Sequence, residues 1–460
     1  MRKKLIYCIV LTKFFALQAQ QTVGLIKHTS GSTNGYILFA PIASKITYLI
    51  DKCGRSVHTW KSNYTPRQSA YLLPDGSLLR AGNDSVVNFS GRTRGIIEKF
   101  DWDNKLIWSY TFPNYRECQH HDVCPLPNGN ILVLAWEIKS SQELIALGRD
   151  PQQQGKALWA EKIIELKPIG TNSATVVWEW RVLDHIVQDY NASAPNYGSV
   201  LENPQLFDIN FLAQKLDDWQ HFNSVSYNAK LDQIIISNRN HGEFFIIDHS
   251  TTIKQAASHQ GGKRNKGGDI LYRWGNPMTY RAGTKADQQL FGQHYPHWIP
   301  EGLKDGGKIL VFNNGFLRPE ENYSSIDIID PPVDKKGNYK LMPGTAYLPE
   351  EPFWRYMAPN PTRFFSMNIS NAQRLPSGNT LICSGANGNF FEIDESKNVV
   401  WFYINPIGGN GPIIQGNEPS KNSVFRCFFY EPSYSAFSGR HLTSGSSLEF
   451  NPNNAPCSVK

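Results

Sequence analysis

The sequence is short of the features that would place it in several large classes of protein. Past the N-terminus, no segment approaches the roughly 20 consecutive apolar residues of a membrane-spanning helix. Long stretches with helical periodicity are scarce as well. The chain has 7 cysteines but no Cys-x-x-Cys pair, which argues against a zinc site or a dithiol redox site built on cysteine. These absences favour a globular, strand-rich protein.

The charge of the chain shows no large excess of either sign once its N-terminus is set aside. Residues 1–20, MRKKLIYCIVLTKFFALQAQ, have a basic start, an apolar middle and small residues near the end. This pattern is typical of a signal peptide, so we expect residues 1–19 to be cleaved and the protein to be exported to the periplasm or the extracellular space. A membrane anchor is the alternative. Four of the 46 basic residues lie in this segment, and the others nearly balance the 40 acidic residues, so nothing predicts binding to nucleic acid.

Six cysteines would remain in the exported chain. An even number of cysteines in an oxidising compartment permits several disulfides, and we expect at least one. The sequence does not say which cysteines pair. Cys427 and Cys457 flank a C-terminal tail that begins near residue 421, and they could pin it. The six are Cys53, Cys118, Cys124, Cys383, Cys427 and Cys457.

Short runs of β-branched and aromatic residues recur along the chain, for example NILVLAW and EFFIIDH. Glycine, proline, asparagine and aspartate separate these runs, and the 36 glycines and 28 prolines supply the turns. Runs of this length between turn residues are typical of β-hairpins. The sequence therefore predicts an all-β fold.

A repeated frame organises these runs. In four segments a proline follows the first position by six residues and a glycine follows it by eight: QSAYLLPDGSLL, HDVCPLPNGNILVL, HYPHWIPEG and SNAQRLPSGNTLI. A fifth segment, HFNSVSYNAKLDQIIIS, fits the same place with a looser turn. Between the frames lie strand pairs that close on Trp or Tyr, such as IIEKFDWDNKLIWSY. Repeats of four strands predict the blades of a β-propeller.

The number of repeats sets the number of blades. Five frames, together with an N-terminal hairpin over residues 35–60, predict a six-bladed β-propeller that spans residues 20–460 as one domain, with loop inserts in the longer intervals. We expect the N- and C-terminal segments to share a blade and close the ring, because this leaves no sheet edge unpaired. A stack of β-sandwiches is the alternative, and the aromatic-closed repeat disfavours it.

The first position of the frame carries histidine in three of the five repeats. Equivalent positions in successive blades of a propeller approach the central axis at one face, so we expect these histidines to share a pocket. A single histidine would most simply be structural, whereas three in register indicate a site. His120, next to the first of them, is expected to point elsewhere. The first positions are, in order, Gln68, His121, His221, His294 and Ser370.

Two interpretations of three converging histidines compete. Three imidazoles around an open position form a familiar catalytic zinc site. Alternatively, one histidine is a nucleophile in group transfer and the others act as acid, base or charge stabiliser. Asn223 and Arg239 lie on the strand system that carries His221, and an arginine with a neighbouring amide repels a metal cation and favours an oxyanion such as sulfate or phosphate. Asp122, beside His121, argues weakly for the cation. We therefore predict transfer of an anionic group without a metal or another cofactor.

These same segments carry a resemblance to a known family. HHDVCPLPNGNILVLAWE, HFNSVSYNAKLDQIIISNRN and AQRLPSGNTLICSGANGNFFEID resemble segments of the bacterial arylsulfotransferases. The resemblance runs from Gly35 to Pro406 and continues weakly into FRCFFYEPSYSAFSGR. It implies a six-bladed propeller that moves a sulfuryl group from an aryl sulfate donor to a phenolic acceptor, without a nucleotide donor. It leaves the oligomeric state open, a homodimer included.

The resemblance also implies roles for individual residues. The family's sulfate-accepting histidine falls on His294 of the segment GQH. The supporting histidines fall on His121 and His221, the amide on Asn223 and the guanidinium on Arg239. The implied intermediate is a sulfohistidine, and the implied kinetics are ping-pong.

The sequence departs from the family pattern directly after His294. Tyr295, Pro296 and His297 stand where related chains often carry Asp and Ala. His297 is therefore a second candidate nucleophile, but the frame selects His294 because Pro300 follows it by six residues. Two functions of other classes stay open: a non-catalytic propeller that binds an anion or another ligand, and a metalloenzyme that uses the three histidines as ligands.

Overall fold

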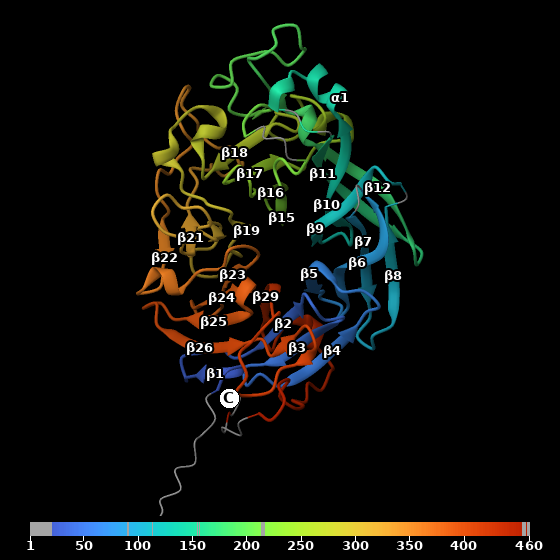
Figure 1. The fold of residues 1–460 in the computed structure, drawn as a ribbon, viewed down its shortest axis with the longest axis vertical. Coiled ribbons are helices and arrows are strands. Elements are labelled where there is room, and N and C mark those ends of the chain that lie inside the picture. Colours follow the sequence, from blue (N-terminus) through green and yellow to red (C-terminus); the bar gives the residue numbers. More distant parts are fainter. Residues whose placement is uncertain are drawn as a thin grey trace, which may run out of the picture.

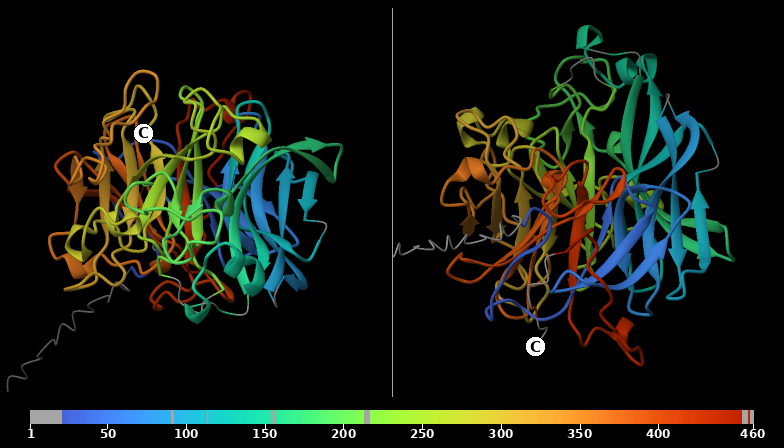
Figure 2. Two further views of the ribbon diagram at one scale, coloured as in Figure 1. Left: turned by 90° about the horizontal axis from the view of Figure 1, so that it is seen from above. Right: turned by 60° about the horizontal axis from the view of Figure 1, so that its bottom comes forward.

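The computed structural model describes residues 21–89, 92–112, 114–153, 155, 157–212, 217–452 and 457, and the predicted signal peptide lies outside these residues. Over the described residues, six antiparallel sheets stand around a common centre (Figure 1). Seen from the side, the strands run across the thickness of the ring, and the connecting loops lie on its two faces (Figure 2). The predicted six-bladed β-propeller is confirmed, and the alternative of stacked sandwiches is wrong.

Apart from the C-terminal strand β29, the strands of blades one to three come from the first part of the chain, and they are named here from the innermost outward. Blade one consists of β29 (Val424–Tyr430), β2 (Tyr36–Pro41), β3 (Ile46–Asp51) and β4 (Ser56–Lys61). Blade two consists of β5 (Pro66–Leu72), β6 (Leu78–Phe89), β7 (Arg92–Phe100) and β8 (Leu106–Thr111). Blade three consists of β9 (Glu117–Pro125), β10 (Ile131–Ser140), β11 (Ala157–Ile169) and β12 (Ser173–Arg181).

Blades four to six follow in the same order around the ring. Blade four consists of β15 (Phe222–Asn228), β16 (Gln233–Asn238), β17 (Glu243–Asp248) and β18 (Ile270–Trp274). Blade five consists of β19 (His294–Trp298), β20 (Ile309–Asn313), β21 (Ser325–Ile329) and β22 (Trp354–Tyr356). Blade six consists of β23 (Asn371–Arg374), β24 (Thr380–Ser384), β25 (Asn389–Ile393), β26 (Val399–Ile404) and β1 (Gly24–His28).

Short elements occupy the connections between blades and strands. Two-residue strands form the pairs β13 (Ile186–Val187) with β14 (Phe207–Asp208) and β27 (Ile407–Gly408) with β28 (Gly411–Pro412). The α-helices among the described residues are α1 (Ser141–Ala146) and α2 (Ile253–Ala256). Within the described ranges, no helix is long and apolar enough to cross a membrane.

The two ends of the chain close the ring, as predicted. The C-terminal strand β29 forms the inner strand of blade one, where Tyr430 pairs with Tyr36. The N-terminal strand β1 forms the outer edge of blade six, where Leu25 pairs with Tyr403. Because each terminus completes a sheet made by the other end of the chain, the ring closes without an unpaired inner edge.

The aromatic residues that close each strand pair link one blade to the next. In five of the six blades, a tryptophan on the fourth strand from the centre donates its indole N–H to a backbone carbonyl of the following blade. A recurring residue of the sequence thus has a recurring structural task. The bonds are Trp60 to Asp101 (3.0 Å), Trp108 to Ser173 (2.8 Å), Trp180 to Gly268 (2.7 Å), Trp274 to Pro349 (2.6 Å) and Trp401 to Lys52 (2.8 Å).

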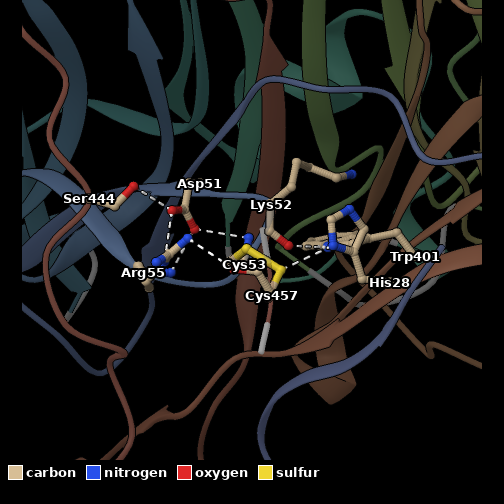
Figure 3. Close-up of a disulfide and its surroundings, with 8 residues drawn as sticks. All are labelled: His28, Asp51, Lys52, Cys53, Arg55, Trp401, Ser444 and Cys457. Atoms are coloured by element: carbon tan, nitrogen blue, oxygen red, sulfur yellow. Dashed lines mark hydrogen bonds and ion pairs between the residues drawn. A yellow bond between two sulfur atoms is a disulfide. The ribbon is translucent and has the colours of Figure 1, made fainter. Parts of the chain in front are cut away.

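A disulfide between Cys53 and Cys457 ties the C-terminal end to blade one, so at least one disulfide is present, as predicted. Cys53 lies in the turn between β3 and β4, and Cys457 Sγ lies 3.1 Å from Nδ1 of His28 in β1 (Figure 3). The bridge therefore stands where the two ends of the chain meet. Cys427, the other cysteine considered as a pin, is a buried free thiol in β29.

Candidate functional site

The inner strands begin with irregular backbone at the positions that the frame singled out. Gln68, His121, His221 and Ser370 have positive φ angles of 105°, 47°, 57° and 94°. The register of strand pairing shifts beside the first three of them, in β5, β9 and β15. Bulges of this kind re-aim side chains, and left-handed backbone at residues other than glycine persists only where the surrounding structure holds it. The frame thus marks where side chains turn towards the axis.

In blade five the irregularity falls one residue later. His294 pairs with Phe312, whereas His297 pairs with Leu310, so an extra residue is inserted between the two histidines. Tyr295, in this bulge, has the positive φ of 53°. His294 is therefore held in the regular ladder at the start of β19.

The ring of His294 is fixed through its Nδ1 atom. His294 is 2% exposed, and its Nδ1 lies 2.7 Å from Oδ1 of Asn314 and 3.0 Å from the carbonyl of Gly292. The amide of Asn314 cannot be turned round, because its Nδ2 donates to the carbonyls of Ser366 and Ile369. Oδ1 therefore faces the histidine, and the proton of a neutral His294 must reside on Nδ1.

The other ring nitrogen, Nε2, carries the lone pair. It accepts the backbone N–H of Ile369 at 3.1 Å. Burial lowers the pKa of His294 well below its usual value, and the positive charge of Arg239 lowers it further. His294 is thus a neutral imidazole whose nucleophilic nitrogen is defined by its partners.

His221 and Arg239 lie beside each other on blade four. Asp218 Oδ2 lies 2.6 Å from Nδ1 of His221, and the backbone N–H of Arg239 donates to the carbonyl of His221. The guanidinium of Arg239 donates to Oδ1 of Asn240 at 3.1 Å. Asp218 is the counter-charge that acts on Arg239. This arrangement directs Nε2 of His221 away from the carboxylate and leaves a planar cation near His294.

His121 and His221 are in contact, with ring centroids 4.5 Å apart. Nδ1 of His121 lies 2.9 Å from Nδ1 of His120. The prediction that His120 points elsewhere is therefore wrong. The extra residues that bulge β9 against β10, between the pairs Val133–Val123 and Ala135–Gln119, bring successive side chains to the same place.

His120 is packed into the wall of the site. Its ring stacks on Trp136 with centroids 3.9 Å apart. Its Nε2 lies 2.9 Å from Oε2 of Glu161, which is a close approach without the alignment of a hydrogen bond. Burial lowers the pKa of His120 and raises that of Glu161, so both groups favour their uncharged forms.

A cavity of about 330 Å³ opens beside these histidines. The lining does not include His294, Asn223 or Arg239, and Nε2 of His294 is covered by the Ile369 N–H. The lining consists of Ile42, Pro66, Arg67, Gln68, Asn83, His120, His121, Trp136 and His221.

Asn223 contacts the backbone of the residue that precedes His294. Its Nδ2 donates to the carbonyl of Gln293 at 2.9 Å, directly before His294. Asn223 is fully buried. The structure thus brings all five predicted residues into one region, and Asn223 is not part of the cavity lining.

Arg426, on the closing strand β29, belongs to the same region and was missed by the sequence reasoning. Its guanidinium donates to Oδ2 of Asp122 at 2.7 Å and to the carbonyl of Asn223 at 3.1 Å. The carboxylate of Asp122 is paired with Arg426, so Asp122 is no longer evidence for a bound metal cation. Arg426 occurs in the segment FRCFF, outside the repeated frame. The only signal in the sequence was a basic residue among aromatic residues. In the structure its guanidinium lies over the rings of Tyr295 and Phe425.

Asn314 and Asp218 were missed as well. Asn314 comes directly after β20, and Asp218 comes three residues before His221. Neither occupies a repeated position of the frame, so only the folded chain shows that they orient His294 and His221.

His297 lies apart from the polar contacts of His294. Its Nδ1 lies 3.1 Å from the carbonyl of Tyr295, and its ring packs against the Tyr295 ring with centroids 4.5 Å apart. Burial lowers the pKa of His297 to about 4.

The donor atoms of the three axial histidines do not form a cluster for a metal. In the part of the chain that the structure describes, two groups of side chains have donor atoms close enough to hold an ion. One comprises His28, Cys53 and Cys457, and the other His185, His259 and Asp269. Neither includes an axial histidine, so the arrangement favours the anion-transfer interpretation over a His₃ metal centre.

Comparison with known proteins identifies relatives of this chain. An arylsulfate sulfotransferase (AssT) of Lelliottia amnigena is 26% identical over 188 residues, which cover 39% of this chain and 29% of the relative. The match thus spans less than a third of the relative's length. Two solved structures of low similarity are a protein of unknown function from Bacteroides caccae (12% identity, TM-score 0.42, covering 81% of this chain and 94% of that one) and a periplasmic gluconolactonase of Pseudomonas aeruginosa (12% identity, TM-score 0.40, covering 81% and 97%). We draw no conclusion from those two likenesses.

A family model covers far more of the chain. The model described as arylsulfotransferase (ASST) matches residues 22–427, from the segment before β1 into the closing strand β29. This range contains the strands of all six blades, except for the last three residues of β29, and every residue of the site described above. The chain therefore belongs to the arylsulfotransferase family.

Proposed function

We propose that the protein is an aryl-sulfate sulfotransferase that carries the sulfuryl group on Nε2 of His294. The observation that carries this proposal is the state of His294: a neutral imidazole with its proton fixed on Nδ1 by Asn314 and a cation, Arg239, acting on it. A neutral imidazole has a nitrogen lone pair that can attack sulfur, whereas a protonated ring does not. Membership of the arylsulfotransferase family supports the same class of reaction.

In the first half-reaction, Nε2 of His294 attacks the sulfur of the aryl sulfate. A bond forms between nitrogen and sulfur while the bond between sulfur and the phenolic oxygen breaks. The negative charge is spread over the sulfuryl oxygens, and the planar guanidinium of Arg239 can contact two of them. The donor's sulfur must approach where the Ile369 N–H now lies, so binding displaces that contact.

His221 is the acid and base of this scheme. Asp218 holds its Nδ1, in the manner of the carboxylate–histidine pair of hydrolases, and Nε2 is left to exchange a proton. The departing phenolate takes a proton from His221, and the incoming phenol later returns one to it. The phenol oxygen then attacks sulfur, the bond to His294 breaks, and the neutral histidine is restored. His121, in contact with His221, completes the wall against which the aryl group lies.

We also propose that the enzyme acts outside the cytoplasm. The disulfide between Cys53 and Cys457 supports this, because such bonds form and persist in oxidising compartments.

Release of phenol from a chromogenic aryl sulfate tests the proposed reaction. We expect sustained release only when a second phenol is present, with parallel double-reciprocal plots as donor and acceptor are varied, since two half-reactions share one intermediate. Equal release without acceptor would identify a hydrolase. Binding of the donor without release would identify a ligand-binding propeller.

A further inference from the structure

Two histidines and an aspartate meet at the boundary between blades three and four, apart from the central cavity. Oδ1 of Asp269 lies 2.9 Å from Nδ1 of His185 and 2.7 Å from Nδ1 of His259. His185 follows β12, whereas His259 and Asp269 belong to the insert between β17 and β18. One carboxylate oxygen thus lies between imidazole nitrogens from two blades, and all three donor atoms lie within 4.8 Å of one another.

The second ring nitrogen of His185 is already occupied. Nε2 of His185 lies 2.7 Å from the carbonyl of Ala256, at the end of α2. Histidines that bind metals almost always donate their other N–H to a carbonyl or a carboxylate, which fixes the ring and selects the ligand nitrogen. Trp180 stacks parallel to His185, with centroids 5.4 Å apart, and also holds the ring in place. Nδ1 of His185 is therefore the atom presented to Asp269 and His259.

The backbone around the cluster is shaped to bring these groups together. A Cβ atom at Gly268 would lie 2.1 Å from the Ala256 carbonyl and 2.6 Å from Nε2 of His185, so only glycine allows this approach. The Gly268 carbonyl accepts the indole N–H of Trp180 at 2.7 Å. Two cationic side chains nearby in the sequence pair with other carboxylates, Lys263 with Asp232 and Arg264 with Asp248.

We propose that His185, His259 and Asp269 form a binding site for a divalent transition-metal ion, with zinc as the ion that fits best. Two imidazole nitrogens and a carboxylate oxygen are ligands that zinc accepts, at distances of roughly 2.0–2.2 Å. Ligand atoms around a tetrahedral ion lie about 3.3 Å apart, so the present contacts need to open by only a few tenths of an ångström. His259 is 58% exposed, which gives the ion access and leaves the fourth position to water.

The bound ion would join blade three to the insert of blade four. The site lies outside the central cavity, so its role is to fix the insert over residues 253–269 rather than to take part in sulfuryl transfer. The proposal does not depend on the proposed sulfotransferase activity.

Metal binding to the full-length mature protein, purified without a polyhistidine tag, tests this site. We expect one Zn²⁺ per chain by equilibrium dialysis with elemental analysis, and with Co²⁺ the visible absorption of a four-coordinate complex with nitrogen ligands. His259→Ala and Asp269→Asn should weaken binding at least about tenfold and abolish the Co²⁺ band. His259 is exposed and Asn is isosteric with Asp, so both variants should fold, which far-ultraviolet circular dichroism checks.

Two control variants locate the ion. His441→Ala removes an exposed histidine elsewhere, and His294→Ala removes the central one; both should bind Zn²⁺ and Co²⁺ as the wild type does. Zinc binding that survives in both His259→Ala and Asp269→Asn would overturn the proposal, as would binding lost in His294→Ala but kept in those two variants. A wild-type protein that binds neither ion would also overturn it.

Discussion

His294 and His297 lie on the same strand, three residues apart, but their surroundings differ. His294 is held by groups from two other segments, with Asn314 at Nδ1 and the Ile369 N–H at Nε2. His297 turns its Nδ1 back to the carbonyl of Tyr295, within its own strand. Burial lowers the pKa of both. Both rings are buried, but only His294 is also oriented by groups outside its own strand, and this is why we propose His294 rather than His297 as the nucleophile.

The largest effect should come from removing His294, and removal of His297 is the matched control. We expect His294→Ala to lower kcat/KM for sulfuryl transfer by at least about 10⁴-fold, because no covalent intermediate can form. His297→Ala should keep activity within about tenfold of the wild type, since it removes packing rather than the nucleophile. Steady-state assays of both variants check this, and a reversed order would assign the nucleophile to His297.

A second test removes the cation whose charge acts on His294. Arg239→Lys keeps the charge but loses the planar, two-pronged contact with the sulfuryl oxygens, so kcat should fall by about 10²–10³-fold. Arg239 is not among the groups whose charge acts on His297. A variant with unchanged kcat would show that Arg239 does not contact the transferred group.

The contact that distinguishes the two histidines most directly is the one from Asn314. We expect Asn314→Ala to lower kcat by about 10–100-fold with little change in KM, because the ring is misplaced while the donor cavity is intact. Asn314→Asp should restore much of kcat, since a carboxylate also accepts the Nδ1 proton, and should move the acid limb of the pH profile upward. Equal loss in both variants would indicate a structural role only.

The smallest expected effect concerns stability at acidic pH. The pKa of His297 is about 4 in the folded chain, against about 6.5 when exposed. The unfolded chain therefore binds more protons between these values, so stability is complete above pH 6.5 and falls as the pH is lowered towards 4. By linkage, His297 accounts for about 2 kcal/mol of the loss between pH 7 and pH 5.

The variant His297→Gln should lack this part of the pH dependence. As the pH falls from 7 to 5, the free energy of unfolding of the wild type should decrease by about 2 kcal/mol more than that of the variant. Denaturant unfolding at the two pH values measures it. Parallel curves would show that His297 is not buried as a neutral ring.

The propeller architecture could be predicted because the same sequence pattern recurs in successive blades. The frame with proline at six residues and glycine at eight marks the end of the inner strand in four of the six blades, and the tryptophans that close the strand pairs bind the next blade. Since a propeller brings equivalent positions together, the same frame located His121, His221 and His294.

The residues that orient these histidines were not predictable in the same way. No other repeat carries a residue equivalent to Asn314, Asp218 or Arg426. The side chains that they contact lie on other strands or loops, so the repeated frame does not reveal these contacts. The bulge in β9 turns the side chain of His120 towards the site, and no residue pattern in the sequence predicts this bulge. Repeats reveal scaffold and register, whereas orienting contacts require the folded chain.

The most direct test of a sulfohistidine at His294 is intact-protein mass spectrometry after brief exposure to an aryl sulfate without acceptor. We expect an added mass of one sulfuryl group on the wild type and on His297→Ala, which disappears when a phenol is added, and no added mass on His294→Ala. An adduct that persists in His294→Ala and is lost in His297→Ala would contradict the account. Full transferase activity without any adduct on the wild type would contradict it as well, because sulfur would then pass directly between the two phenols.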